Sequence, residues 1–300
     1  MKKILFGLSL LVLTCSTVNL RAQNYVTADD ESNLSNFYKR EIASTKKALP
    51  YPHLRESDVI WETCIWRTVD FREKFNQFFY FPKGTDTIEN NQGRINLTWL
   101  LVRAVRNGDI TVYDDDELKT PLGIDDVEKR INKQRHGKTD AITDEEYGDI
   151  LEEGHDTIIP VPFTPEDYYQ IKLKEYWYID KQDTRMKVRI IGLCLVDDNM
   201  KEDEDGGVTA DPKDRFWVPL NDMAVRNLLA KANAYDMYNN SLERSYDEIF
   251  ISRYFDSYIT RETNVYNRNI HDYLTGEDAQ LESNAIEERI FDIESDMWEY

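Results

Sequence analysis

The sequence has few of the residues that build catalytic and metal sites. Its 300 residues include three cysteines and four histidines, and the histidines (His53, His136, His155 and His271) are far apart in the chain. No zinc-binding set therefore stands out. There is no complete phosphate-binding loop and no G-x-G-x-x-G, G-x-S-x-G, H-E-x-x-H or C-x-x-C motif. We expect a protein without a catalytic centre, metal or cofactor.

Basic residues are also scarce, with 37 Lys and Arg against 57 Asp and Glu and a net charge of −20. A nucleic-acid binder needs clustered cations to neutralise phosphates, so we expect no nucleic-acid partner. A basic protein partner or divalent cations would fit the charge better, although solubility alone can explain an acidic excess. The nearest approach to a calcium loop starts at Lys201 and has Pro212 at its twelfth position. Both residues are wrong for calcium, which leaves an acidic cation-binding module as an alternative only.

The one long apolar run is Ile4–Leu13, ten residues that follow two lysines. It is too short to span a bilayer, which takes about 20 residues. With a plausible cleavage site at Ala22, it predicts a signal peptide over residues 1–22 and export of the mature chain. Cys15 follows this run as a lipidated cysteine would, but Thr14 is larger than the residue usual before such a cysteine. Lipidation is therefore the minor alternative.

Cleavage would leave Cys64 and Cys194, both in apolar surroundings. Export would permit a disulfide, but buried free thiols are the more common state of such residues, and we favour them. A periplasmic enzyme that uses Cys64, with His53 or His271 as its base, is the alternative function. The charged group between Arg253 and Asp272 offers a second enzymatic alternative, although salt bridges at helix ends explain it equally well.

The periodicity of apolar residues predicts an alternation of helices and strands. We expect a long amphipathic helix over residues 58–75, although the same stretch also alternates as a strand would. The other predicted helices are 37–42, 96–107, 125–134, a short one at 164–167, 222–233, one that begins with a capping box at Ser245, and 277–298. The predicted strands are 78–81, 109–113, 174–180, 186–197 and 215–219, of which 174–197 forms a hairpin.

This order predicts an α+β fold, with antiparallel hairpin strands, flanking amphipathic helices and a helical C-terminal quarter. The proposed organisation is a signal peptide (1–22), an N-terminal arm (23–50), an α+β domain (51–275) and a C-terminal helix (276–300). In the final helix we expect Leu281, Ile286, Ile290, Phe291 and Ile293 to point inward.

Aromatic residues supply the candidates for partner contact. In DVIWETCIWRTVDF, residues 58–71, a helix would direct Trp61 into the core and Trp66 with Arg67 toward another element or subunit. Tyrosine joins apolar area to a hydroxyl, which suits interfaces. The candidate partner-binding residues are Trp66, Arg67, Tyr254, Tyr258, Tyr266, Trp298 and Tyr300.

Whole phrases of the sequence resemble one protein family. They are RESDVIWETCIWRTVDFREKFNQFFYFP, KEYWYIDKQDTRMKVRIIGLCLV, RFWVPLNDMAVRNLLAKANAYD and the last sixty residues, which end in DMWEY. In this order, from about Tyr51 to Tyr300, they resemble the gliding-motility family GldN, also called PorN.

The resemblance implies a non-enzymatic, periplasmic component of the type IX secretion system. It also implies a ring complex with an outer-membrane lipoprotein of the GldK/PorK type, which the periplasmic part of a GldM/PorM-type protein contacts. Membrane association would come only through partners. The resemblance supplies no catalytic residues. The tripeptides that begin at Asp86 and Asp156 resemble O-glycosylation sites of related bacteria, with Thr87 and Thr157 as possible acceptors.

Overall fold

The computed structural model describes residues 46–83, 94–138, 142–143, 150–152, 156–161, 163–183, 185–202, 208–236, 239 and 241–297, with the backbone alone for 133–161 and 198–211. Several predictions lie outside the described residues: the signal peptide with Cys15, the helix at 37–42, Thr87, Trp298 and Tyr300. The proposed domain boundaries stay predictions.

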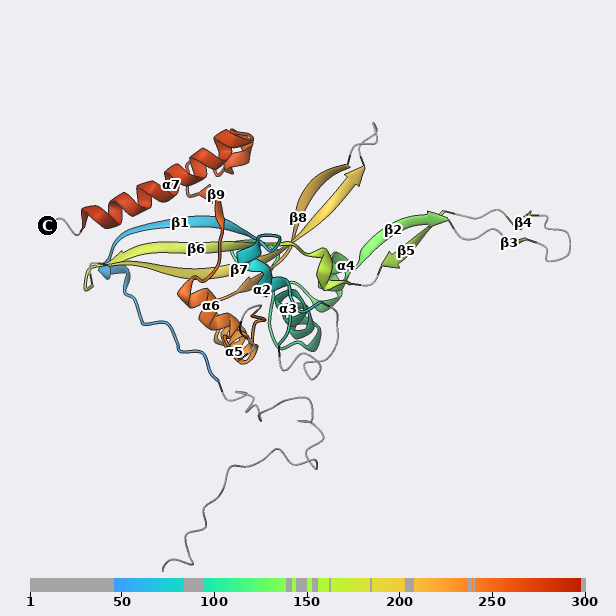
Figure 1. Ribbon diagram of the computed structural model, residues 1–300, viewed down its shortest axis with the longest axis horizontal. Helices are drawn as coiled ribbons and strands as arrows, with labels where there is room; N and C mark the ends of the chain where they lie inside the picture. Colours follow the sequence, from blue (N-terminus) through green and yellow to red (C-terminus); the bar gives the residue numbers. More distant parts are fainter. Residues whose placement is uncertain are drawn as a thin grey trace, which may run out of the picture. The chain divides into compact units, whose positions relative to one another are not determined.

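The fold is built on a five-stranded antiparallel sheet with the strand order β8-β7-β6-β1-β9 (Figure 1). These strands are β1 (Val59–Asp70), β6 (Gln170–Asp180), β7 (Met186–Glu202), β8 (Val208–Pro219) and β9 (Tyr258–Glu262). Two small antiparallel pairs join β2 (Lys133–Lys138) to β5 (Asp156–Val161) and β3 (Ile142–Thr143) to β4 (Ile150–Glu152). With the helices below, the sheet confirms the predicted α+β class.

The helices are α2 (Gln77–Tyr80), α3 (Leu97–Asn107), α4 (Ile124–Ile131), α5 (Met223–Lys231), α6 (Tyr246–Ser252) and α7 (Glu277–Asp296). Helix α3 begins where the Asn96 side chain accepts two backbone N–H groups, and it ends at Gly108, whose φ of 76° suits glycine. Helix α6 begins with the predicted capping box at Ser245. These helices and the β6–β7 hairpin confirm the corresponding sequence predictions.

The predicted helix over residues 58–75 is wrong, because Val59–Asp70 forms strand β1 between β6 and β9. The segment is rich in β-branched residues such as Ile65 and Val69, which pack well on a pleated surface. Both of these side chains are fully buried. Strand β6 pairs with β1 along its length, and β9 pairs with residues 65–68 on the other edge. This long-range pairing overrides a helical periodicity that the sequence also contains.

Four other local predictions need correction. Residues 78–81 do not form a strand, since Gln77–Tyr80 is a single helical turn that places Phe79 in the core. Residues 109–113 form no regular strand, and within them Tyr113 alone makes isolated β-bridges, to Pro121 and to Trp217. The predicted helix 125–134 ends at Ile131, because strand β2 begins at Lys133. The turn at 165–167 is a 3-10 helix without a side-chain cap from Thr164.

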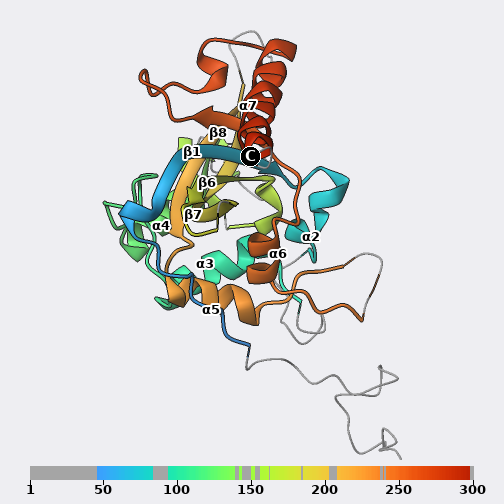
Figure 2. The same ribbon diagram turned by 90° about the vertical axis from the view of Figure 1, so that its left-hand side faces the viewer.

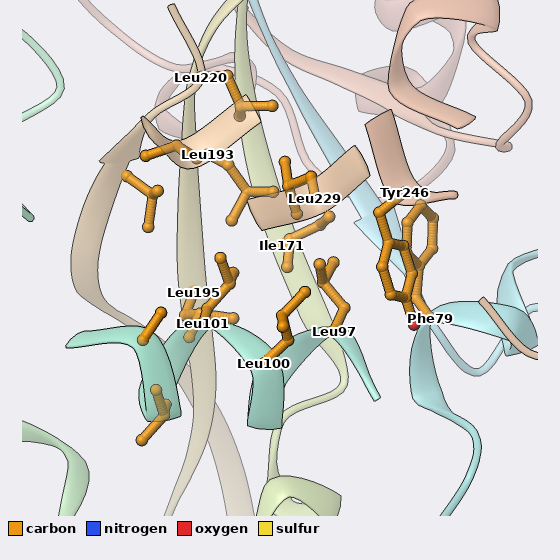
Figure 3. Packing of buried hydrophobic residues seen from close by; sticks show 14 of the residues in the cluster. Phe79, Leu97, Leu100, Leu101, Ile171, Leu193, Leu195, Leu220, Leu229 and Tyr246 are labelled. Atoms are coloured by element: carbon orange, nitrogen blue, oxygen red, sulfur yellow. The ribbon is translucent and has the colours of Figure 1, made fainter. Parts of the chain in front are cut away.

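The main core lies between the sheet and helices α2 to α6. Figure 3 shows leucines of α3 meeting Ile171, Leu193 and Leu195 of the sheet. Beside them, the Phe79 and Tyr246 rings stack with centroids 6.0 Å apart. The Tyr246 hydroxyl donates a hydrogen bond to the Ile95 carbonyl oxygen at 2.7 Å, which satisfies its polar end inside the core.

A second, smaller core lies under α7, where Ile65 and Ile259 of the sheet meet the inner face of the helix. That face consists of Ala279, Ser283, Ile286 and Ile290, which follow the three-to-four spacing of a helix. Leu281 and Phe291 were expected to point inward, but they are 57% and 67% exposed. Both are rotated away from the 279–283–286–290 stripe, so that part of the prediction is wrong.

Candidate functional site

Neighbouring residues of β1 and β6 point to opposite faces of the sheet, and each face carries its own charged cluster. Trp66 pairs with Lys174 of β6 and with Arg261 of β9. The next residue of β1 is Arg67, and the next residue of β6 is Glu175. Alternation therefore separates Trp66 and Lys174 from Arg67 and Glu175. We define the Glu175 cluster and the Asp116 cluster by the acid at the centre of each.

The Glu175 cluster is buried. The Glu175 carboxylate is fully buried and accepts hydrogen bonds from Arg253 Nη1 at 2.5 Å and from Trp177 Nε1 at 3.0 Å. Arg67 Nε lies 3.4 Å from the same carboxylate, and Arg67 is 3% exposed. Along β1, Arg67 falls between Ile65 of the smaller core and Val69 of the main core. The cluster therefore joins the two cores through charged hydrogen bonds.

Two features fix the outer ends of the Glu175 cluster. Arg67 Nη2 donates to Glu287 Oε1 of α7 at 3.0 Å, which connects the sheet to the final helix. Arg253 ends α6 in the left-handed region, with φ of 51°, where glycine is the usual residue. An arginine there costs about 1 kcal/mol or more of backbone strain, and its long side chain reaches Glu175 from this position.

The Asp116 cluster lies on the other face of the sheet and has a similar composition. Asp116 Oδ2 accepts hydrogen bonds from Trp66 Nε1 at 2.9 Å and from Arg261 Nη2 at 2.7 Å. Lys174 Nζ donates to the Asp116 carbonyl oxygen at 2.8 Å. The Arg261 guanidinium lies 3.5 Å from the centre of the Trp66 ring, and Lys174 Nζ lies 5.2 Å from it. Trp66 is therefore held between two cations by cation–π contacts.

A polar groove of about 460 Å³ opens beside the Asp116 cluster. Trp66, Tyr258 and Arg261 line one part of it, and Lys172 with Asp214 lines another. The groove contains both charge signs, and several of its charges already pair, for example Lys172 Nζ with Asp214 Oδ1 at 2.6 Å. Within the parts of the chain that the structure describes, no three His, Cys, Asp or Glu side chains are grouped to hold a metal ion.

A second hollow is mainly apolar and has a volume of about 370 Å³. We call it the α6 pocket. Its apolar walls are Phe75, Phe78, Tyr235, Leu242, Ile249 and Tyr254. Phe75 is 47% exposed and Tyr254 is 43% exposed, although their rings pack with centroids 4.8 Å apart. Half-exposed aromatic side chains of this kind are typical of protein interfaces.

The thiols do not support the enzymatic alternative. Cys64 and Cys194 are free and buried, as we expected. Burial raises the pKa of Cys64 to about 11, an increase that the nearby Lys174 only partly offsets, and burial also raises the pKa of Cys194. At neutral pH both are thiols rather than thiolates, and the thiol is a poor nucleophile. In the other enzymatic candidate, Arg253 and Arg261 already bind Glu175 and Asp116.

The structure distributes the candidate partner-binding residues over several places. Trp66 and Tyr258 line the polar groove, and Tyr254 lines the α6 pocket. Tyr266 is 77% exposed on the loop after β9, while Arg67 is buried inside the chain. Of the glycosylation candidates, only the backbone of Thr157 is described, in strand β5. Their contacts with partners or sugars stay predictions.

Sequence reasoning missed Asp116, Lys174 and Glu175. Asp116 belongs to an acidic run, Asp114 to Glu117, that gives no sign of which carboxylate is used. Lys174 and Glu175 become neighbours of Trp66 and Arg67 only through the β1–β6 register. If β1 had been predicted as a strand, its alternation would have separated Trp66 from Arg67, but not identified their partners.

The chain matches one known protein family over most of its length. Residues 54–299 match the family described as "Gliding motility associated protein GldN". The chain belongs to the GldN family. The match includes every strand of the sheet and all of α2 to α7, so both charged clusters and the α6 pocket lie inside the family region.

This GldN-family chain is accordingly a component of gliding motility and type IX secretion. No curated protein matches its sequence significantly. Among the described residues, no helix combines the length and the apolar character needed to cross a membrane.

Proposed function

We propose that this protein is a non-enzymatic periplasmic subunit of the type IX secretion and gliding machinery. In this proposal several copies form a ring with an outer-membrane lipoprotein of the GldK/PorK type. The periplasmic domain of a GldM/PorM-type protein contacts that ring, and the protein reaches the membrane only through its partners.

The observation that carries the proposal is the family match over residues 54–299, which covers the described fold nearly from end to end. The signal-peptide pattern in residues 1–22 supports the periplasmic location. The chemistry of the described side chains supports a structural role, because the candidate nucleophile Cys64 is held as a buried thiol and the prominent cations are held in ion pairs.

The exposed surface supports assembly. Phe75, Tyr254 and Phe291 are each more than two-fifths exposed, and Tyr266 is more exposed still. Aromatic residues dominate interface energetics, so several separate aromatic surfaces suit a protein that contacts more than one neighbour.

Co-expression with the lipoprotein partner tests the proposal. We expect the two proteins to elute together from size exclusion as a complex of many copies, with the mass measured by light scattering. A monodisperse monomer beside unassociated lipoprotein would contradict the proposal. Normal secretion by cells that carry Cys64→Ala or His271→Ala would remove the remaining support for an enzyme.

A further inference from the structure

The α6 pocket combines apolar walls with a cationic rim. Lys74 and Arg244 line its edge, and the Arg244 guanidinium lies 4.0 Å from the centre of the Tyr254 ring. Asp236 also lines the pocket and accepts the Asn239 backbone N–H at 2.9 Å. The pocket therefore offers two cations beside half-exposed aromatic rings on a chain whose net charge is −20. The natural occupant is a segment that is both aromatic and acidic.

The chain itself carries such a segment at the end of α7. Residues 291–300, FDIESDMWEY, contain three aromatic side chains, four acids and no base. Within the described part of this segment, Phe291 is 67% exposed, and Asp292 and Asp296 are exposed as well. The inner face of α7 is already used by Ala279, Ser283, Ile286 and Ile290, so Phe291 packs on none of the cores described above.

The segment and the pocket belong to different sides of the fold. In Figures 1 and 2, α7 lies on the far side of β1 from α5 and α6. A contact between this segment of one copy and the α6 pocket of the next is therefore heterologous, that is, head-to-tail. Heterologous contacts repeat from copy to copy and produce a ring when the rotation closes.

We propose that the acidic aromatic segment 291–300 of one copy docks in the α6 pocket of a neighbouring copy. Phe291, Trp298 and Tyr300 supply the apolar contact, and the acids face Lys74 and Arg244. This inference deepens the proposed ring function and rests on it. The proposed occupant of the pocket is therefore the segment of a second copy. The test distinguishes it from two other occupants, the lipoprotein and the segment of the same copy.

Charge inversion provides the test, in the full chain co-expressed with the lipoprotein. The pocket variant carries Lys74→Glu and Arg244→Glu. The segment variant carries Asp292→Lys, Glu294→Lys and Asp296→Lys, where lysines at a helix C-terminus favour the helix dipole. We expect each variant alone to lose the large complex, because like charges then face each other, while each still co-purifies with the lipoprotein.

Co-expression of the two variants with each other is the decisive arm. In the mixture, the unchanged acidic segment of the pocket variant can bind the unchanged cationic pocket of the segment variant. The lysines in the segment of the segment variant can likewise pair with the glutamates in the pocket of the pocket variant. We expect the large complex to return, with the two variants present in equal amounts. Lys129→Glu on α4, a side chain remote in sequence from both sites, is the charge control. Leu281→Ala is the apolar control on α7. Far-ultraviolet circular dichroism and thermal melting verify that each variant folds.

The other outcomes overturn the inference in distinguishable ways. If each variant alone keeps the large complex, the contact does not exist, although the ring function stands. If the pocket variant loses the lipoprotein, the pocket binds that partner instead. If the mixture fails while one chain with all five substitutions assembles, the segment occupies its own pocket. If the unchanged chain forms no large complex, the proposed function itself fails.

Discussion

The Glu175 cluster and the Asp116 cluster are made of the same parts on opposite faces of one sheet. Each has a carboxylate between two cations, with a tryptophan indole N–H as a further donor. Their surroundings differ, because the Glu175 side chain is 0% exposed and the Asp116 side chain is 27% exposed. Water can replace a lost partner in the second cluster but not in the first.

This difference predicts different roles. A buried ion pair does not necessarily stabilise a fold more than apolar residues would, but the loss of one partner leaves the other charges without compensation. The Glu175 cluster therefore connects the two cores and α7 only while all its buried partners are present, and the loss of any one of them destabilises the fold strongly. The Asp116 cluster is screened by solvent, so it holds Trp66 and the 109–122 segment in place at small energetic cost and stays accessible from the groove.

The largest effect is expected for Glu175→Gln. The neutral side chain has nearly the same shape but leaves Arg67 and Arg253 buried without their shared carboxylate, which costs about 3–5 kcal/mol of the free energy of unfolding. Urea denaturation measures this loss. Glu287→Gln is the matched control, because Glu287 contacts Arg67 from the surface with a side chain that is 59% exposed; we expect it to cost less than about 1 kcal/mol. Equal losses would remove the distinction between buried and exposed partners.

Asp116→Asn should have a much smaller effect. The amide oxygen can still accept from Trp66, while the attraction to Arg261 and Lys174 is lost, so we expect a cost of about 1 kcal/mol in low salt. Added salt should reduce this cost and leave that of Glu175→Gln nearly unchanged, since buried pairs are screened less. The same urea titration at two ionic strengths measures both. Asp126→Asn serves as an exposed control on α4, and a salt-independent loss for Asp116→Asn would show that its cluster behaves as a buried one.

The smallest effect is expected for alkylation of Cys64, which lies on the same face as Trp66. Its pKa rises from 9.0 to about 11 because of burial. Below pH 9 the thiolate fraction is then roughly a hundredfold smaller than in the unfolded chain. The stability gained from the neutral thiol is present below about pH 9 and is lost as the pH rises through 11. Mass spectrometry after iodoacetamide treatment should find Cys64 unmodified in the native protein and modified in denaturant. Rapid native modification would mean that the buried Cys64 side chain becomes exposed to solvent in the folded protein.

The sequence predicted best where the determining interactions are local. The caps at Asn96, Gly108 and Ser245 act within three or four residues, and α3 and α6 begin or end at them. The β6–β7 hairpin was also predicted, because strong β-formers on both sides of a polar turn need no distant partner to be recognised. These elements were sufficient to give the α+β class.

Prediction failed where distant segments decide. Residues 58–75 satisfy a helical and an alternating pattern, and only pairing with β6 and β9 selects the strand. The same pairing decides the candidate site. Trp66 and Trp61 lie on opposite faces of β1, and the neighbours of Trp66, which are Lys174, Arg261 and Asp116, come from three remote segments. Arg67 was expected to reach toward another element or subunit, and only the tertiary structure shows that it is buried and contacts Glu287 of α7.

The sequence by itself determined the charge balance, the scarcity of catalytic motifs, the locally capped helices and the family resemblance that the match to GldN then confirmed. The tertiary structure decided which carboxylates lie among which cations, how exposed each is, and which aromatic side chains stay outside the cores. Those properties depend on strand register and on the packing of helices from remote parts of the chain. No periodicity within a single segment encodes them.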